Sequence, residues 1–257
     1  MCRPRQRSAS RGGSSSPAAA HRIRVTVRVR PRISEDEELA AAQPPVAGFD
    51  DDCVEEDPAQ QAILLRRPYY DARAFTLDGV LDRSATQAQT YEVVARGVVD
   101  DVLTGVNGTV LAYGQTGTGK THTIYGPLRY WRRATTSRGG QSLQPQLELS
   151  GIVTRAAIQI FAHIDELRAA GDGREFAVRL SSLQIYQESV CDLLRPGGAA
   201  NLAIREDPNS GVYVESLSEH AVHSPDNVLE LVQAHPSPWP VDNSTNPRPN
   251  PLPDPES

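Results

Sequence analysis

Lysine is almost missing from this chain of 257 residues. Lys120 is the only one, so every other side chain among the 26 Lys and Arg residues is an arginine. Cysteine is scarce as well, because Cys2, Cys53 and Cys191 are far apart and form no CxxC pair. Neither a zinc site nor a disulfide framework is predicted, and free thiols in a reducing compartment are the simpler interpretation. No apolar run reaches the roughly 18 residues of a membrane span, so no membrane partner is expected.

Acidic residues are missing from the first part of the chain. From Arg3 to Arg32 every charged side chain is an arginine, whereas from Ser34 to Asp57 every charge is Asp or Glu. The acidic stretch argues against a nucleic-acid binder. Residues 1–21 are expected to form a disordered basic extension, with an organelle transit peptide as the alternative. Residues 235–257 hold eight prolines and are expected to form a disordered tail, which leaves 22–234 as the folded part.

Hydrophobic patterns divide this folded part into the short strands and helices of an α/β domain. Alternating or continuous apolar residues predict strands at Ile23–Val29, Ala62–Leu65, Ala74–Leu77, Thr109–Tyr113, Phe176–Tyr186, Val212–Val214 and Ala221–His223. Start signals and helical spacing predict helices after Ser84, from about Lys120, over Thr154–Ala170, over Ser189–Leu194 and from Ser224. Residues 126–150 follow neither pattern and are expected to be an exposed insertion.

Two of these helices show a clear inner face. The first has capping-box spacing at Ser84–Gln87 and ends at Gly105, and its predicted inner residues are Tyr91, Val94, Val98 and Val102. The helix over 154–170 is predicted to turn inward Ile158, Phe161, Ile164 and Leu167. Both helices should therefore pack against the sheet or against each other.

A phosphate-binding loop is the most specific feature of the sequence. The pattern GxxxxGK[ST] is complete over Gly114, Gln115, Thr116, Gly117, Thr118, Gly119, Lys120 and Thr121. The glycines allow backbone N–H groups to surround phosphates, and the following helix directs its positive end at them. Lys120 is expected to reach the β- and γ-phosphates and Thr121 to ligate Mg²⁺. The loop thus predicts binding of a nucleoside triphosphate.

The position of the lone lysine supports this interpretation. A compact ammonium on a flexible stem fits between phosphate oxygens, whereas a planar guanidinium does not. Guanine-specific phosphate-loop proteins resemble one another in an Asn-Lys-x-Asp element, which a chain with no second lysine cannot contain. Adenine is therefore favoured over guanine as the base.

The flanking sequences resemble a kinesin motor domain. The resemblance covers about Ile23 to Gln233 and rests on Tyr113–Thr123 around the loop, Arg28-Val29-Arg30-Pro31, Asn107-Gly108-Thr109, Ser182–Glu188 and Asp192-Leu193-Leu194. Gly151–Ala156 and Leu202–Asp207 are most similar to the armadillo-repeat kinesins of plants and algae. The resemblance implies a phosphate-loop nucleotide triphosphatase fold, in which helices flank a central mixed β-sheet.

The resemblance also implies a function and further site residues. Kinesins bind ATP with Mg²⁺ and move along microtubules, which would place this chain in the cytoplasm on the cytoskeleton. Arg28, Pro31 and His122 would flank the adenine, and Tyr91 would lie near it. Aromatic, proline and arginine faces are physically suited to a planar base.

Two kinesin elements do not occur in these 257 residues. They are an N-x-x-S-S-R-S-H switch that senses the γ-phosphate and a D-L-A-G-S-E switch that holds the Mg²⁺ shell and positions water. No catalytic residue can therefore be assigned, because phosphoryl transfer depends on positioning and charge stabilisation. The loop strand would also lack its central neighbours, so we expect the isolated chain to be unstable or to aggregate.

One microtubule-contacting region is expected around Tyr213-Val214-Glu215. Family members often carry a cation where this chain has Glu215, and an acidic residue weakens contact with the acidic tubulin surface. The sequence gives no oligomeric state.

Three hypotheses remain at this point. The chain is the N-terminal part of a kinesin-like, microtubule-stimulated ATPase, or a truncated pseudo-motor that binds nucleotide without hydrolysis or movement. An unrelated phosphate-loop kinase or ATPase is the third, and the flanking motifs argue against it.

Overall fold

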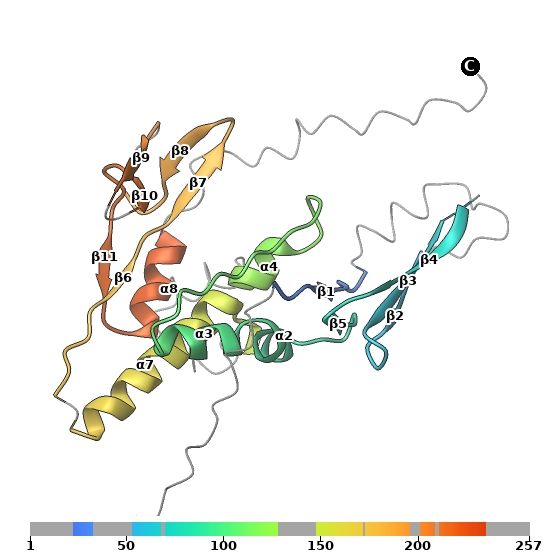
Figure 1. Cartoon of the computed structure of the whole chain (residues 1–257), viewed down its shortest axis with the longest axis horizontal. Coiled ribbons are helices and arrows are strands. Elements are labelled where there is room, and N and C mark those ends of the chain that lie inside the picture. The colour runs from blue at the N-terminus through green and yellow to red at the C-terminus, as the bar shows by residue number, and fades with distance from the viewer. Residues whose placement is uncertain are drawn as a thin grey trace, which may run out of the picture. The chain divides into compact units, whose positions relative to one another are not determined.

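The structure, a computed structural model, divides into two compact units (Figure 1). It describes residues 23–32, 53–67, 70–127, 148–171, 173–195, 201–208 and 211–234. The predicted basic extension, the Pro-rich tail and most of the predicted insertion lie outside these residues. The first unit lies within residues 1–29 and 33–82, and the second contains 30–32 and 83–257.

The first unit is built from strands. Strand β1 (Thr26–Arg28) pairs in parallel with β5 (Gly79–Leu81). Strands β2 (Val54–Asp57), β3 (Ala62–Arg67) and β4 (Tyr70–Thr76) form an antiparallel sheet in that order. The strands predicted at Ile23–Val29, Ala62–Leu65 and Ala74–Leu77 are therefore present, and β4 begins earlier than predicted. Only β5 is buried along its whole length.

The second unit contains all the helices that the structure describes in full. They are α2 (Gln87–Val94), α3 (Arg96–Leu103), α4 (Lys120–Tyr125), α7 (Ile152–Ala169) and α8 (Pro225–Ala234). One core cluster joins α2, α3 and α7 through Tyr91, Ala95, Val99 and Ile152. A second cluster joins α7 to α8 through Ala157, Phe161, Ile164, Val222 and Val228. Helix α7 thus belongs to both clusters and connects the two halves of the unit.

The strands of the second unit pair antiparallel. Strand β6 (Val178–Leu180) pairs with β11 (His220–Val222), β7 (Leu183–Tyr186) with β8 (Ser189–Asp192), and β9 (Ile204–Asp207) with β10 (Gly211–Val214). Together with the parallel pair of the first unit, these strands make the fold a mixed α/β one. Across the described residues, no helix combines the length and apolarity needed to cross a bilayer.

The first helical segment begins two residues later than predicted. The capping box is formed by Thr86 and Gln89, whose side chains exchange hydrogen bonds with each other's backbone, and not by Ser84 and Gln87. Gln87 is instead buried and bonded elsewhere. The segment ends at Thr104 and Gly105 as predicted, with Gly105 at φ +100°.

The inner face of this segment also differs from the prediction. Its buried apolar positions are Tyr91, Ala95 and Val99, spaced by four residues, whereas Val102 is exposed. Hydrogen bonds from Ala95 N to Tyr91 O and from Val99 N to Ala95 O carry the helix across the junction between α2 and α3. The pattern of valines misled the prediction because it passed over Ala95, which is the least exposed apolar residue of this face at 1%.

The helix predicted over Ser189–Leu194 is wrong. These residues form β8 and the turn after it, paired with β7 through a tight turn at Gln187 and Glu188. Both turn residues have positive φ, at 46° and 63°. Neither is a glycine or an asparagine, so the usual sequence signal of a two-residue hairpin is missing. The single strand predicted over Phe176–Tyr186 is divided into β6 and β7.

The buried strand predicted at Thr109–Tyr113 is also wrong. The segment has no strand partner among the residues that the structure describes, and Leu111 and Tyr113 are 84% and 96% exposed. Strand pairing is a non-local interaction, so an apolar run alone does not produce a strand.

Candidate nucleotide-binding site

The phosphate loop turns back on itself directly before α4 (Figure 1). Thr118 closes the turn, since both its backbone N–H and its hydroxyl donate to the carbonyl of Gln115, at 3.2 and 2.8 Å. Gly117 and Gly119 have φ of +86° and +94°, in the left-handed region. A Cβ at either position would meet nothing within 4 Å. Glycine is therefore required here by backbone conformation and not by crowding.

Lys120 folds back over the loop. Its Nζ donates to the carbonyl oxygens of Gly114 and Gln115, at 2.8 and 2.9 Å. The ammonium is thus held beside the loop backbone by two neutral acceptors. Phosphate oxygens form stronger, charge-assisted bonds with an ammonium than carbonyls do. The side chain is therefore already placed where anionic oxygens would meet both it and the backbone of the loop.

Thr121 and His122 follow on α4 with exposed side chains. Thr123 N donates to Gly119 O at 2.9 Å, which starts the helix as the sequence predicted. The helix is short and ends at Gly126, where φ is +92°. Sequence and structure thus agree on the order of loop, Lys120 and helix.

The proposed adenine-flanking residues are divided between the two units. Arg28 lies on β1 in the first unit, and its pKa is lowered by burial. Pro31, Tyr91 and His122 belong to the second unit. Each of these residues is therefore described within its own unit.

Tyr91 is a core residue. It is 5% exposed, and its hydroxyl donates to Gln159 Oε1 of α7. Gln159 Nε2 in turn donates to Asp100 Oδ1 at 2.6 Å. Burial, assisted by the charges of Asp100 and Glu92, raises the pKa of Tyr91 to about 12. This chain of polar groups ties α2, α3 and α7 together beneath the loop helix.

Gln87, which the sequence assigned only to helix capping, forms a hydrogen bond to α4. It is 6% exposed, and its Nε2 donates to the carbonyl of His122 at 2.6 Å. No motif marks this role. The sequence holds one indication of it. Thr86 and Gln89 also match a capping box, and if they form it, the side chain of Gln87 does not cap the helix.

Two glycines join the end of α4 to the start of α7. A Cβ on Gly151 would lie 2.5 Å from Ile124 O, and one on Gly126 would lie 2.5 Å from Leu149 O. Gly151 N donates to Tyr125 O at 3.2 Å. Arg155 also donates from Nε to Ser150 O at 2.9 Å. The residues on either side of the predicted insertion thus contact each other directly.

The Asp-Leu-Leu motif has a structural explanation. Asp192 is fully buried, and its two carboxylate oxygens accept from the backbone N–H groups of Leu194 and Ser218, at 2.9 and 2.8 Å. Burial alone would raise the pKa of Asp192, but hydrogen bonds from Ser218, Leu194 and Arg195 outweigh it and lower the pKa. The motif therefore fastens the β7–β8 hairpin to the segment before β11.

Glu215 lies directly after β10 and is paired. Its Oε2 accepts from Arg205 Nε on β9 at 3.1 Å. Both side chains are about half exposed. The charge of Glu215 is therefore offset by a neighbouring arginine of the same hairpin, which the sequence did not reveal.

Comparisons with known proteins follow the same motifs. A family model described as the kinesin motor domain matches residues 28–237. The Kinesin-like protein KIN-UB of Arabidopsis thaliana is 35% identical over 231 residues, which are 90% of this chain and 22% of the relative. The Kinesin-like protein KIN-UA of the same plant is 39% identical over 213 residues, 82% of this chain and 20% of the relative. The Kinesin-like protein KIF3C of Mus musculus is 35% identical over 222 residues, 85% of this chain and 24% of the relative.

The chain spans about a fifth of the length of the curated relatives that it matches. The family match nevertheless covers most of the chain and contains the phosphate loop, the capped helix before it and the Asp-Leu-Leu motif. On this basis the chain belongs to the kinesin motor domain family, whose α/β fold is that of a phosphate-loop nucleotide triphosphatase.

Proposed function

We propose that this chain supplies the nucleotide-binding part of a microtubule motor and holds ATP with Mg²⁺ on residues 114–121. The observation that carries the proposal is the placement of the single lysine. Lys120 Nζ lies within hydrogen-bond distance of two carbonyls of the loop whose backbone would surround the phosphates. An ammonium in this place can neutralise the β- and γ-phosphates.

The metal would be held by few protein ligands. Among the residues that the structure describes, no group of three or more His, Cys, Asp or Glu side chains is placed to hold a metal ion. Mg²⁺ commonly keeps several waters and binds through one or two protein oxygens and the substrate phosphates. The exposed hydroxyl of Thr121 suits this kind of site, because it offers one neutral oxygen beside the loop.

For the base we propose a site flanked by Arg28, Pro31 and His122, with Tyr91 in support. His122 is exposed on α4, and an imidazole ring is suited to stacking on a planar base. Tyr91 is buried and bonded to Gln159, so its proposed contribution is to hold α2 behind this region. Adenine is the proposed base, because the chain contains no second lysine for a guanine-reading element.

We further propose that ATP hydrolysis drives movement along microtubules in the cytoplasm. The support is membership of the kinesin motor domain family and the names of the relatives as kinesin-like proteins. No residue of this chain is assigned to orienting the attacking water. The β9–β10 hairpin is the proposed microtubule contact, and its Arg205–Glu215 pair reduces the repulsion expected from Glu215 alone.

The direct test is substitution of Lys120. In a full-length protein that contains this chain, Lys120→Ala is expected to weaken binding of a fluorescent ATP analogue with Mg²⁺ by at least about 100-fold, because an unpaired phosphate charge is costly. Lys120→Arg keeps the charge and is the matched control. A loss of at least about tenfold in this variant is expected, since a guanidinium does not replace the compact ammonium. Unchanged affinity in Lys120→Ala would refute the assigned site.

A further inference from the structure

Gln87 connects two elements that are 35 residues apart in the chain. It is the first residue of α2, and its Nε2 donates to the backbone carbonyl of His122 on α4 at 2.6 Å. The same carbonyl accepts from Gly126 N at 2.8 Å. A side chain of α2 and the last turn of α4 therefore converge on one oxygen of the residue proposed to stack on the base.

Helix α4 depends on such tertiary contacts for its orientation. It has six residues, and its N-cap Gly119 makes no side-chain hydrogen bond. A helix of this length is not stable alone, because its few backbone hydrogen bonds do not offset the cost of forming the first turn. Its direction is thus set by what it touches, which includes the packing of Ile124 in the core and the bond from Gln87.

The structure separates this bond from the capping of α2. Thr86 and Gln89 form the capping box by themselves. Gln87 is turned inward and is nearly completely buried. This hydrogen bond is partly buried, and a hydrogen bond shielded from water contributes more than an exposed one. Gln87 and Gln89 therefore lie in the same helical turn but serve different purposes.

We infer that Gln87 is a positioning residue for the base end of the nucleotide site. By fixing the carbonyl of His122, it sets where the His122 side chain stands relative to residues 114–121. The phosphate loop has its own internal hydrogen bonds through Thr118 and Lys120. Gln87 should consequently affect affinity for the adenine base and leave affinity for the phosphates nearly unchanged. This inference rests on the proposed function.

The test compares two ligands in the same full-length protein that is used for Lys120→Ala. The dissociation constants of MgATP and of Mg²⁺ with inorganic tripolyphosphate, which has no base, are measured by calorimetry. Gln87→Met keeps the length of the side chain and removes the donor. We expect roughly tenfold weaker ATP binding, as for the loss of one buried hydrogen bond, with tripolyphosphate binding within about twofold of wild type.

Gln89→Met is the matched control. It removes half of the capping box from the same turn but leaves the bond to His122 intact. Its melting temperature should fall, while its ratio of ATP to tripolyphosphate affinity stays that of the wild type. If Gln87→Met and Gln89→Met change this ratio equally, Gln87 acts only through helix stability and the inference is wrong.

A second variant, Gln87→Glu, adds a pH profile and tests the inference even if Gln87→Met does not fold. A buried glutamate has a raised pKa, and only its protonated carboxyl can donate a hydrogen bond. Gln87→Glu should therefore bind ATP more weakly than wild type at pH 8 and approach the wild-type value near pH 5.5. A constant ratio to wild type across this range would overturn the inference.

Lys120→Ala measured beside these variants separates the two proposals. Loss of both ligands in Lys120→Ala together with an unchanged ligand ratio in Gln87→Met would leave the proposed function standing and reject the role of Gln87. Retention of both ligands in Lys120→Ala would reject the proposed function itself.

Discussion

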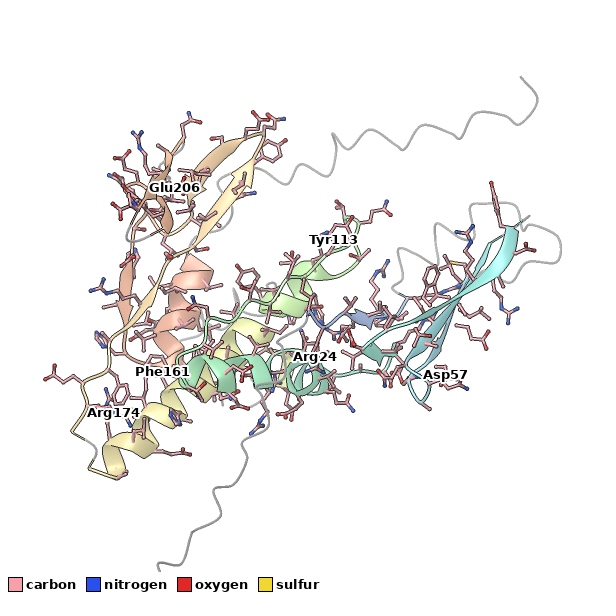
Figure 2. All side chains as sticks on the ribbon, in the orientation of Figure 1. Arg24, Asp57, Tyr113, Phe161, Arg174 and Glu206 are labelled. Carbon is pink, nitrogen blue, oxygen red and sulfur yellow. The ribbon has the colours of Figure 1, made fainter. Side chains whose placement is uncertain are left out.

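The two flanks of the phosphate loop differ in how they are held. On the C-terminal side, Ile124 packs into the α2–α3–α7 core, and Gly126 is buried against the residues that precede α7. On the N-terminal side, Val110 still packs against this core, but Leu111 and Tyr113, the latter labelled in Figure 2, are almost fully exposed. Local and helix-mediated contacts thus hold one flank, whereas the other flank has no strand partner among the described residues and exposes its large apolar side chains.

The largest effect on stability is expected at Gly151, where the backbone before α7 packs directly against the backbone of α4. A Cβ in Gly151→Ala would lie 2.5 to 2.6 Å from backbone atoms of Ile124 and Tyr125, which cannot rotate away. We expect a loss of about 3 kcal/mol in the free energy of unfolding, typical of severe overpacking. Urea denaturation followed by circular dichroism measures it.

Gly97→Ala is the control for this substitution. A Cβ at Gly97, on α3, would meet nothing within 4 Å. Alanine should stabilise the helix there by about 0.5 kcal/mol, since it loses less backbone entropy on folding. Equal effects of the two substitutions would show that Gly151 is not confined by α4.

An intermediate effect is expected from the hydrogen bond of Tyr91. Tyr91→Phe removes the donor to Gln159 and should cost about 1 kcal/mol near neutral pH. The pKa of Tyr91 is raised from 10.0 to about 12 in the folded chain. Its contribution is therefore complete below pH 10 and is lost as the pH rises from 10 to about 12.

The measurement is the unfolding free energy of both proteins at several pH values. The difference between wild type and Tyr91→Phe should be largest below pH 10 and shrink toward pH 12. A difference that is constant between pH 8 and pH 12 would contradict the burial of the hydroxyl.

The smallest effect is expected on the exposed flank. Leu111 is 84% exposed, so Leu111→Ser should change stability by no more than about 0.5 kcal/mol. Burying a leucine contributes several times this amount. A loss of 2 kcal/mol or more by thermal or urea denaturation would show that this flank is packed, and the contrast between the flanks would disappear.

Sequence reasoning was most successful where the signal is local. The phosphate loop, the helix start at Lys120 and the helix over 152–169 follow from glycine positions and helical spacing. Ser224 caps α8 as predicted, since its hydroxyl accepts from Asn227 N at 3.2 Å. These features depend on residues within a few positions of each other.

The failures each have a non-local cause. Ser84–Gln87 and Thr86–Gln89 both match the sequence pattern of a capping box. The structure forms the second one, and the side chain of Gln87 is bonded to the carbonyl of His122. The β7–β8 turn is built from Gln187 and Glu188 at positive φ, which local preferences disfavour. The strand at Thr109–Tyr113 needs partners that a pattern of five residues cannot supply.

The contact between Gly126 and Gly151 has a consequence for protein engineering. Because Tyr125 and Gly151 are joined by a backbone hydrogen bond, the chain between them leaves and returns at one point. Lengthening the chain between these two residues therefore does not by itself require the end of α4 and the start of α7 to move apart.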